Sequence, residues 1–298
     1  MKYAIRFFQK SKSINKADEI IIKYTKRETD LVRFAAEHKN VKVIANITEY
    51  TEDPAQDIDI FKCAKSECPN FTILMNNFNA EMELIPALKD NGINFFFAHT
   101  LGGTIDKLES QVAQGASEVY ITNELGFNIK ALAEYYHELG VSVRVLPNVA
   151  QSSASNSKVL DTYKYFFIRP EDMEMYSPYI DTIEFFGDTH SQDTFYDIYF
   201  NKKKWEDDLT YLIAGLRVPL LGNTIPPDGY YAKRRLNCRK ECYRCEACDS
   251  VISIAQTMRE KGYSFNAEGE VLRVDDFIRD PMQIKPARTL VSVDGDTE

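Results

Sequence analysis

The chain has 298 residues, of which 44% are hydrophobic and 27% charged, with only 13 glycines and 11 prolines. This composition excludes low-complexity disorder, collagen and coiled coil, and it provides enough apolar material for a substantial core. The formal net charge of −9 argues against a protein that binds nucleic acid through its overall electrostatics. No apolar run approaches the roughly 18 residues of a membrane-spanning helix, and the first residues lack a signal-peptide pattern, so we expect a cytoplasmic protein.

Short apolar segments, rich in β-branched and aromatic residues, recur along the first two thirds of the chain. They predict eight strands, at Glu19–Tyr24, Val41–Ile47, Phe71–Asn77, Ile93–Thr100, Glu118–Glu124, Val141–Val149, Lys164–Pro170 and Asp181–Gly187. Most are nearly continuous apolar runs, which is typical of parallel strands buried on both faces. The segment Met1–Phe8 is either a ninth strand or the true first strand of the sheet.

Segments with helical spacing lie between these strands, at residues 27–39, 79–92, 104–115 and 128–140. Three of the four end in glycine, the usual residue just past the C-terminus of a helix. Eight β-then-α units predict a (β/α)8 TIM-like barrel. A doubly wound open sheet is the alternative, because both folds share the βαβ unit, but the even spacing and the lack of a glycine-rich phosphate loop favour the barrel.

The pattern changes after Gly187, and we expect the barrel to occupy residues 1–215 and a C-terminal extension residues 216–298. Residues 191–216 predict the closing helices of the barrel, and residues 221–235 predict a loop, since they contain Pro-Pro-Asp-Gly. A cysteine-rich segment follows, then a helix over residues 250–263. The last residues, 290–298, predict a solvated tail.

Four of the six cysteines, Cys238, Cys242, Cys245 and Cys248, fall within eleven residues. In a reducing compartment such a cluster indicates metal or redox chemistry rather than disulfides. The last three have the C-x2-C-x2-C spacing of consecutive ligands in bacterial ferredoxins, and Cys238 could complete a shell of four thiolates. We therefore expect these four residues to bind a [4Fe-4S] cluster, with zinc or a reduced thiol patch as the alternatives.

Two other interpretations of the cysteine segment stay open. Cys238, Cys242 and Cys245 also match the C-x3-C-x2-C motif of radical S-adenosylmethionine enzymes, but in that family the motif follows the first strand. The arginines, lysine and tyrosines of the segment could contact RNA or a phosphate backbone, or could form a solvated charged loop. The two remaining cysteines, Cys63 and Cys68, fall on a predicted helix and its end and are interpreted as ordinary thiols.

In barrel enzymes the active site forms at the carboxyl ends of the strands. We expect four catalytic residues there: His99, Glu124, Arg169 and Glu184. Either glutamate could be a general base, and Arg169 could hold an anionic group. The candidate substrate-binding residues are Asn46, Asn77, Asn123, Asn148 and Gln151. Alternatively, a divalent metal could be bound by His99, Glu184, Asp188 and His190, or these strand ends could be polar only because they meet water.

Three short motifs give the chain a distant resemblance to the peptidase U32 family. They are Gly115–Tyr120 in one strand, Asn128 before the next helix, and Gly140–Arg144 leading into the following strand. The resemblance extends from Met1 to Tyr263 and implies a TIM-like barrel. The family includes collagenase-like proteins and oxygen-independent hydroxylases of RNA or quinone precursors, and the hydroxylases hold a [4Fe-4S] cluster on four cysteines late in the chain. The family's cysteines are spread over a longer stretch than the four here.

The resemblance and the cysteine spacing together imply a redox enzyme, in particular one that hydroxylates an RNA base or a small aromatic precursor and receives electrons from a donor or protein partner. A second hypothesis is a binding or assembly module with a structural zinc or iron–sulfur clip. A third is a peptidase or a metal-dependent hydrolase or lyase that uses the barrel mouth, although no Ser-His-Asp order, nucleophile elbow or HExxH motif is present.

Overall fold

The computed structural model describes residues 1–7, 14–25, 29–47, 54–76, 83–98, 104–121, 128–147, 168–185, 195–199, 229–239, 244–265, 271–274 and 290–292. The chain divides into two compact units. The barrel unit comprises Met1–Leu125, Ala131–Leu146 and Tyr179–Tyr196, and the C-terminal unit comprises Gly126–Lys130, Pro147–Pro178 and Asp197–Glu298. The expected boundary between residues 215 and 216 lies outside the described residues.

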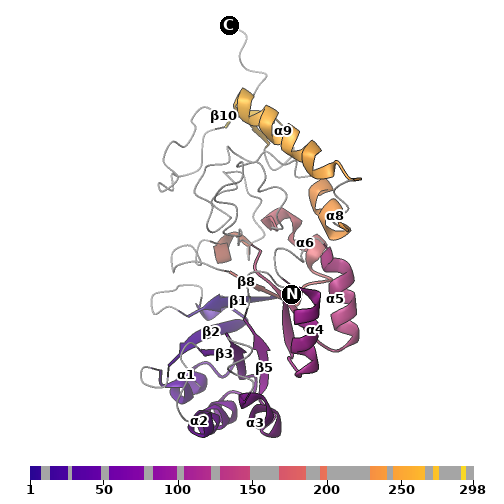
Figure 1. The fold of residues 1–298 in the computed structure, drawn as a ribbon. Coiled ribbons are helices and arrows are strands. Elements are labelled where there is room, and N and C mark those ends of the chain that lie inside the picture. Colours follow the sequence, from indigo (N-terminus) through magenta and orange to yellow (C-terminus); the bar gives the residue numbers. More distant parts are fainter. Residues whose placement is uncertain are drawn as a thin grey trace. The chain divides into compact units, whose positions relative to one another are not determined.

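The barrel unit is built on eight strands: β1 (Lys2–Arg6), β2 (Glu19–Tyr24), β3 (Lys42–Ile47), β4 (Thr72–Met75), β5 (Asn94–Phe97), β6 (Glu118–Ile121), β7 (Ser142–Val145) and β8 (Thr182–Glu184). They pair in the order β5-β4-β3-β2-β1-β8-β7-β6, and every pair is parallel. The two ends of the sheet meet, since the backbone N–H of Ser117 donates to the carbonyl of Phe95 at 2.8 Å. The sheet is therefore a nearly closed barrel with helices between its strands, consistent with the predicted (β/α)8 fold (Figure 1).

The amino-terminal segment supplies the first strand of the barrel. Strand β1 lies between β2 and β8, with Ala4 opposite both Glu19 and Glu184. The strand expected over residues 164–170 is not seen in its described part, because Ile168 and Arg169 lie outside any strand and Pro170 begins a 3-10 helix. Proline has no backbone N–H to donate to a ladder, so it favours the start of a helical turn over the middle of a strand.

Five helices connect the strands: α1 (Leu31–Glu37), α2 (Pro54–Glu67), α3 (Leu84–Asp90), α4 (Ile105–Ala113) and α5 (Ile129–Glu138), together with a 3-10 turn at Ile14–Lys16. Helices α1, α3, α4 and α5 confirm the four helices predicted from the sequence. Gly115 follows α4 with a positive φ of 88°, the left-handed conformation that the predicted glycine stop requires. Cys63 lies within α2 and is exposed, whereas Cys68 just beyond it is buried and donates its thiol to the carbonyl of Val41.

The two faces of the strands differ in chemistry. Residues that face the helices are apolar, as at Ile20, Ile22 and Tyr24 of β2, which pack with Phe34 of α1 and Phe61 of α2. Residues on the opposite face point into the barrel, and several of them are charged. The strands are thus buried on both faces, as the sequence predicts, but their inner face is not continuously apolar.

The C-terminal unit contains a 3-10 helix (Pro170–Asp172), α6 (Met173–Tyr176), α8 (Tyr230–Leu236), α9 (Ala247–Lys261) and an antiparallel sheet of β9 (Tyr263–Phe265), β10 (Val271–Val274) and β11 (Leu290–Ser292). Helix α9 confirms the predicted helix. Two expectations were wrong: residues 230–235 form a helix rather than a loop, and the first residues of the expected tail pair with β10. Gly229 directly precedes α8 with a positive φ of 73°, a conformation that glycine adopts without steric cost. No helix in the described part of the chain is long and apolar enough to cross a membrane.

Candidate functional site

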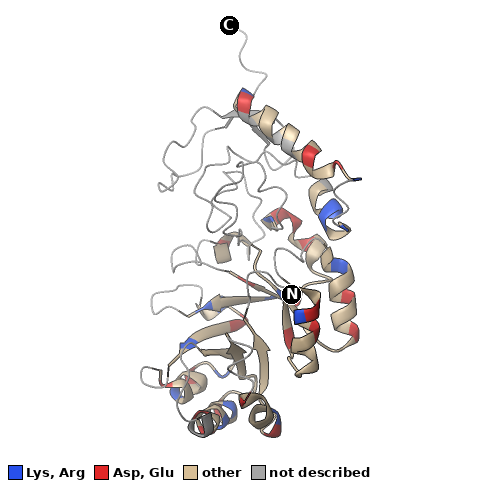
Figure 2. Ribbon diagram, viewed as in Figure 1, with Lys and Arg blue, Asp and Glu red and all other residues tan. Residues whose placement is uncertain are grey.

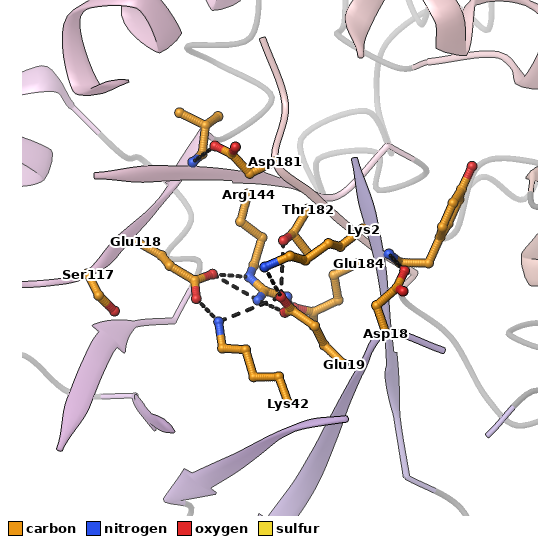
Figure 3. Close-up of polar contacts among 12 residues, drawn as sticks. Lys2, Asp18, Glu19, Lys42, Ser117, Glu118, Arg144, Asp181, Thr182 and Glu184 are labelled. Atoms are coloured by element: carbon orange, nitrogen blue, oxygen red, sulfur yellow. Dashed lines mark hydrogen bonds and ion pairs between the residues drawn. The ribbon is translucent and has the colours of Figure 1, made fainter. Parts of the chain in front are cut away.

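The interior of the barrel holds a network of charged side chains from six strands. It joins the carboxylates of Glu19, Glu118 and Glu184 to the cations of Arg6, Lys42 and Arg144. Figure 3 shows these residues except Arg6, together with Lys2, which lies 3.9 Å from Glu19. Glu19, Lys42 and Glu118 are the first residues of β2, β3 and β6, so they lie at the amino ends of the strands. Arg6 and Glu184 end β1 and β8 and lie toward the carboxyl ends, where barrel enzymes place their active sites.

Arg144 is at the centre of this network and has no exposed surface. Its Nε and Nη2 donate to Glu118 Oε2 at 3.0 and 2.8 Å, and Nη2 also donates to Glu19. Its Nη1 lies 3.6 Å from Glu184 Oε2, and its guanidinium stacks over the Phe96 ring at 4.9 Å from the centroid. One buried cation therefore holds three carboxylates from three separate strands.

The electrostatic consequence is clearest at Glu19. Burial by itself would raise the pKa of this carboxyl, but Arg144 and Lys42 outweigh burial and hold the pKa below its ordinary range. Thr182 adds a hydrogen bond to Glu19 Oε1 at 3.3 Å. Glu19 thus stays ionised inside the barrel because its cationic neighbours are buried with it.

The lowered pKa of Glu19 predicts a loss of stability in acid. Its contribution is fully present above the ordinary glutamate pKa of about 4.3 and is lost as the pH falls through the lower folded-state pKa. We expect Glu19→Gln to lower the unfolding free energy near neutral pH by about 1–3 kcal/mol and to make it less dependent on pH below about 4. Urea unfolding at several pH values measures both effects, and identical acid slopes for the two proteins would contradict this interpretation.

A second group of contacts surrounds Glu184 toward the carboxyl ends of the strands. Arg6 donates from Nε and Nη2 to Glu184 Oε1 at 3.1 and 3.0 Å, and the Tyr120 hydroxyl donates to Oε2. Glu184 has no exposed surface, whereas about a third of the Arg6 side chain is exposed. Burial and Glu184 raise the pKa of the Tyr120 hydroxyl well above its ordinary value, so this hydroxyl remains a hydrogen-bond donor.

Two asparagines also lie at this end of the barrel. Asn46 is the fifth residue of β3 and Asn76 directly follows β4. The Asn76 amide donates to Asn46 Oδ1 at 2.7 Å and to the backbone carbonyl of Ile47. The predicted substrate-binding residue Asn46 is therefore at the carboxyl end, with its side-chain oxygen held by its neighbour.

Arg169 lies in the C-terminal unit, and its charge is balanced locally. Its Nε and Nη2 donate to the two carboxylate oxygens of Asp172 at 2.6 and 3.1 Å, and Nη1 lies 3.3 Å from Glu171. Burial lowers the pKa of this guanidinium, but Asp172 and Glu171 more than compensate and raise it. The arginine is buried and stabilises the turn that begins at Pro170, so the structure places it at a helix start and not at a strand end.

Three of the four clustered cysteines can be located. Cys238 follows α8 and is half-buried, Cys245 precedes α9 and is exposed, and Cys248 is the second residue of α9 and is half-buried. The last turn of α8 is basic (Figure 2), and one of its residues, Arg235, is buried and stacks over the Tyr231 ring at 4.8 Å. Burial lowers the pKa of Arg235, but Tyr231, Cys248 and Cys238 raise it above its ordinary value. Both half-buried cysteines therefore lie within electrostatic reach of this guanidinium.

The structure neither groups candidate metal ligands nor describes the other predicted site residues. Among the residues that the structure describes, no three His, Cys, Asp or Glu side chains are grouped as metal ligands. The candidates outside the described residues are Asn77, His99, Asn123, Glu124, Asn148, Gln151, Asp188, His190 and Cys242. Those assignments stay predictions.

Sequence reasoning missed most of the interior network. The usable signal was a charged residue inside an otherwise apolar strand, such as Arg144 within Ser-Val-Arg-Val or Glu118 at the head of Glu-Val-Tyr-Ile. Such residues need a partner, and a parallel barrel provides it from a strand far away in the sequence. Glu118, Tyr120 and Arg144 also belong to the two strand motifs on which the U32 resemblance rests.

Comparison with known proteins adds little. No family model and no curated protein matches the chain. Among solved structures, a cube-shaped protein cage designed by fusing symmetric oligomeric domains is 12% identical, with a TM-score of 0.42 over 67% of this chain and 70% of the other. A structure described as native KDPGal has the same identity and TM-score over 67% and 92%. A glycerophosphodiester phosphodiesterase from Parabacteroides distasonis is 14% identical, with a TM-score of 0.35 over 58% and 60%. At these levels of similarity the neighbours carry no argument about activity.

Proposed function

We propose that this chain is a U32-like iron–sulfur enzyme that hydroxylates an RNA base or a small aromatic precursor. The observation that carries the proposal is the cluster of Cys238, Cys242, Cys245 and Cys248 within eleven residues. Four thiols in that spacing are a donor set suited to a [4Fe-4S] cluster. The U32 resemblance supports the same interpretation, since its hydroxylases use four late cysteines.

Three of the four cysteines are described, and they are accessible without being grouped into a ligand set. Cys238, Cys245 and Cys248 are exposed or half-buried, so their sulfur atoms are not committed to the apolar core. The Arg235 guanidinium lies within electrostatic reach of Cys238 and Cys248, so a cation accompanies two of the proposed ligands. Replacing a C–H bond with C–OH, with the oxygen taken from water, removes two protons and two electrons from the substrate. When bound, a [4Fe-4S] cluster would carry these electrons one at a time to an external electron acceptor.

Residues of the barrel would bind the substrate and move its protons. Arg6 is partly exposed at the end of β1 and could hold an anionic group of the substrate while remaining paired with Glu184. Glu184 could accept or return a proton, and Glu124 is the second base that the sequence predicts. Tyr120 orients the Glu184 carboxylate by donating to Oε2. Asn46 and Asn76 supply neutral amides for hydrogen bonds to the substrate.

The role of Glu184 predicts a large loss of turnover in Glu184→Gln, which keeps the size of the side chain and removes its basicity. We expect turnover to fall by roughly 10²–10⁴-fold, the range for losing a general base. Products are detected by mass spectrometry as hydroxylated nucleosides or small aromatic compounds after anaerobic incubation with a one-electron acceptor. The assay is run well below the melting temperature of the variant, because Gln leaves Arg6 and Arg144 with less compensating charge.

Tyr120→Phe is the matched control for this prediction. It removes one hydrogen bond to Glu184 and keeps the carboxylate, so turnover is expected to fall far less than in Glu184→Gln. Equal turnover in the folded Glu184→Gln protein and the wild type would exclude Glu184 from proton transfer.

A structural zinc ion is the second candidate for the cysteine segment. Cys238 lies just after α8, and Cys245 and Cys248 lie at the start of α9, so one ion could tie the two helices together. In that case the barrel would be a binding or assembly module, and chelation would lower stability without changing any turnover.

A further inference from the structure

A polar cavity of about 420 Å³ lies at the amino ends of the barrel strands, opposite to the proposed active site. This volume falls in the range of roughly 300–1,000 Å³ that is usual for small-molecule sites. Its lining includes Thr72, Asn94, Ser117 and Ser142, which offer hydroxyl and amide groups, together with Lys42 and Glu118. Such a lining suits a small ligand that carries several hydroxyl groups.

Lys42 connects this cavity to the charged interior. Its side chain is 18% exposed, and its Nζ contacts Glu118 and lies 3.6 Å from Glu19. The Phe96 ring lies 5.6 Å away from Nζ on the inner side. Burial, and then the charge of Arg144, lower the pKa of Lys42 to about 7, although Glu19 acts in the opposite direction. A substantial fraction of Lys42 is therefore uncharged near neutral pH, unlike an ordinary lysine.

We propose that this cavity binds a short hydroxylated aldehyde or ketone and that Lys42 forms an imine with it. The amine nitrogen would add to the carbonyl carbon while the carbonyl oxygen takes up a proton, and loss of that oxygen as water would leave a C=N bond. The ammonium form of Lys42 and the carbonyl compound are thus converted to a protonated imine and one water molecule, and no oxidant or reductant is needed.

The surrounding charges suit this step. The protonated imine carries the same single positive charge as the ammonium group it replaces, so Glu118 and Glu19 balance both forms equally. Glu118, in contact with Nζ, is placed to accept the proton of the amine and return it to the departing oxygen. Lys2 and Asp18 at the rim complete the charged groups around the cavity, and Figure 3 shows both beside the network.

The proposal is tested by trapping the imine on the full chain with cyanoborohydride at about pH 7.5, followed by peptide mass mapping. The probe is glyceraldehyde, and propanal is the apolar control with the same number of carbons. We expect Lys42 to be labelled at least about tenfold faster than Lys62, an exposed lysine of α2 that is also paired with a carboxylate. Labelling by glyceraldehyde should saturate with concentration, whereas labelling by propanal should not.

Two variants test the imine and the cavity separately. Lys42→Arg keeps a cation for Glu118 and Glu19 but cannot form an imine, so the label should disappear from this peptide. Thr72→Val is nearly isosteric and removes one buried hydroxyl from the cavity wall, so it should raise the glyceraldehyde concentration at half-saturation. Labelling of Lys42 no faster than Lys62 in the wild type would overturn the proposal, and rapid labelling without saturation would overturn the cavity as a ligand site. Neither outcome depends on whether the cysteines bind iron.

Discussion

Replacing Arg144 with Met is expected to lower the unfolding free energy of the barrel by about 3–5 kcal/mol, the usual cost of removing one partner from a buried ion pair. Methionine fills much of the same space but leaves Glu19, Glu118 and Glu184 without the cation that joins them. Uncompensated carboxylates are costly in a site that excludes water. Urea unfolding followed by circular dichroism measures the loss.

The control is Arg33→Ala on α1, where an exposed arginine lies 3.5 Å from Glu37. Exposed pairs of this kind contribute about 0–1 kcal/mol, so the variant should unfold almost like the wild type. Equal stability of the Arg144 and Arg33 variants would show that the interior network does not hold the barrel together.

The second large effect is expected on bound iron. Changing Cys238 and Cys248 to Ser together should lower the iron content from about four atoms per chain to less than one, because a shell of four cysteines loses half of its thiolates. Iron and acid-labile sulfide are measured on anaerobically purified protein. Cys63→Ser on α2, which changes an exposed thiol of the barrel unit, should leave both unchanged.

Loss of the iron should also abolish hydroxylation. Retained turnover after Ser replacement of Cys238, Cys242, Cys245 and Cys248 together would contradict the proposed chemistry. Retained iron after the same replacement would move the metal site to the barrel mouth, in agreement with the alternative metal-dependent hydrolase or lyase.

The barrel could be predicted because its signal is local. Each strand carries a short apolar run, and glycine stops mark the ends of the helices between them. The place of Met1–Phe8 stayed open because the segments from Glu19 to Gly187 already predict eight strands. Its two charged residues, Lys2 and Arg6, interrupt the apolar pattern of the segment. The structure explains both, since these residues lie on the same face of β1 and pair with Glu19 and Glu184. Residues 164–170 have the composition of a strand, and only Pro170 at their end hints at the helical turn found there.

The interior network could not be predicted because its contacts are distant in sequence. Arg144 and Glu19 are separated by 125 positions, and Tyr120 and Glu184 by 64. Sequence spacing indicates which residues share a strand face but not which strands meet across a closed barrel. Arg169 is the converse case, because the acids with which it pairs, Glu171 and Asp172, lie only two and three positions further along the sequence.

The measurement that tests the account most directly is the metal content of the full chain after anaerobic purification, with its ultraviolet–visible spectrum. We predict a brown protein with a broad band near ~400 nm and about four iron and four sulfide per chain. A colourless protein with about one zinc per chain would contradict the iron–sulfur assignment and indicate a structural zinc site instead.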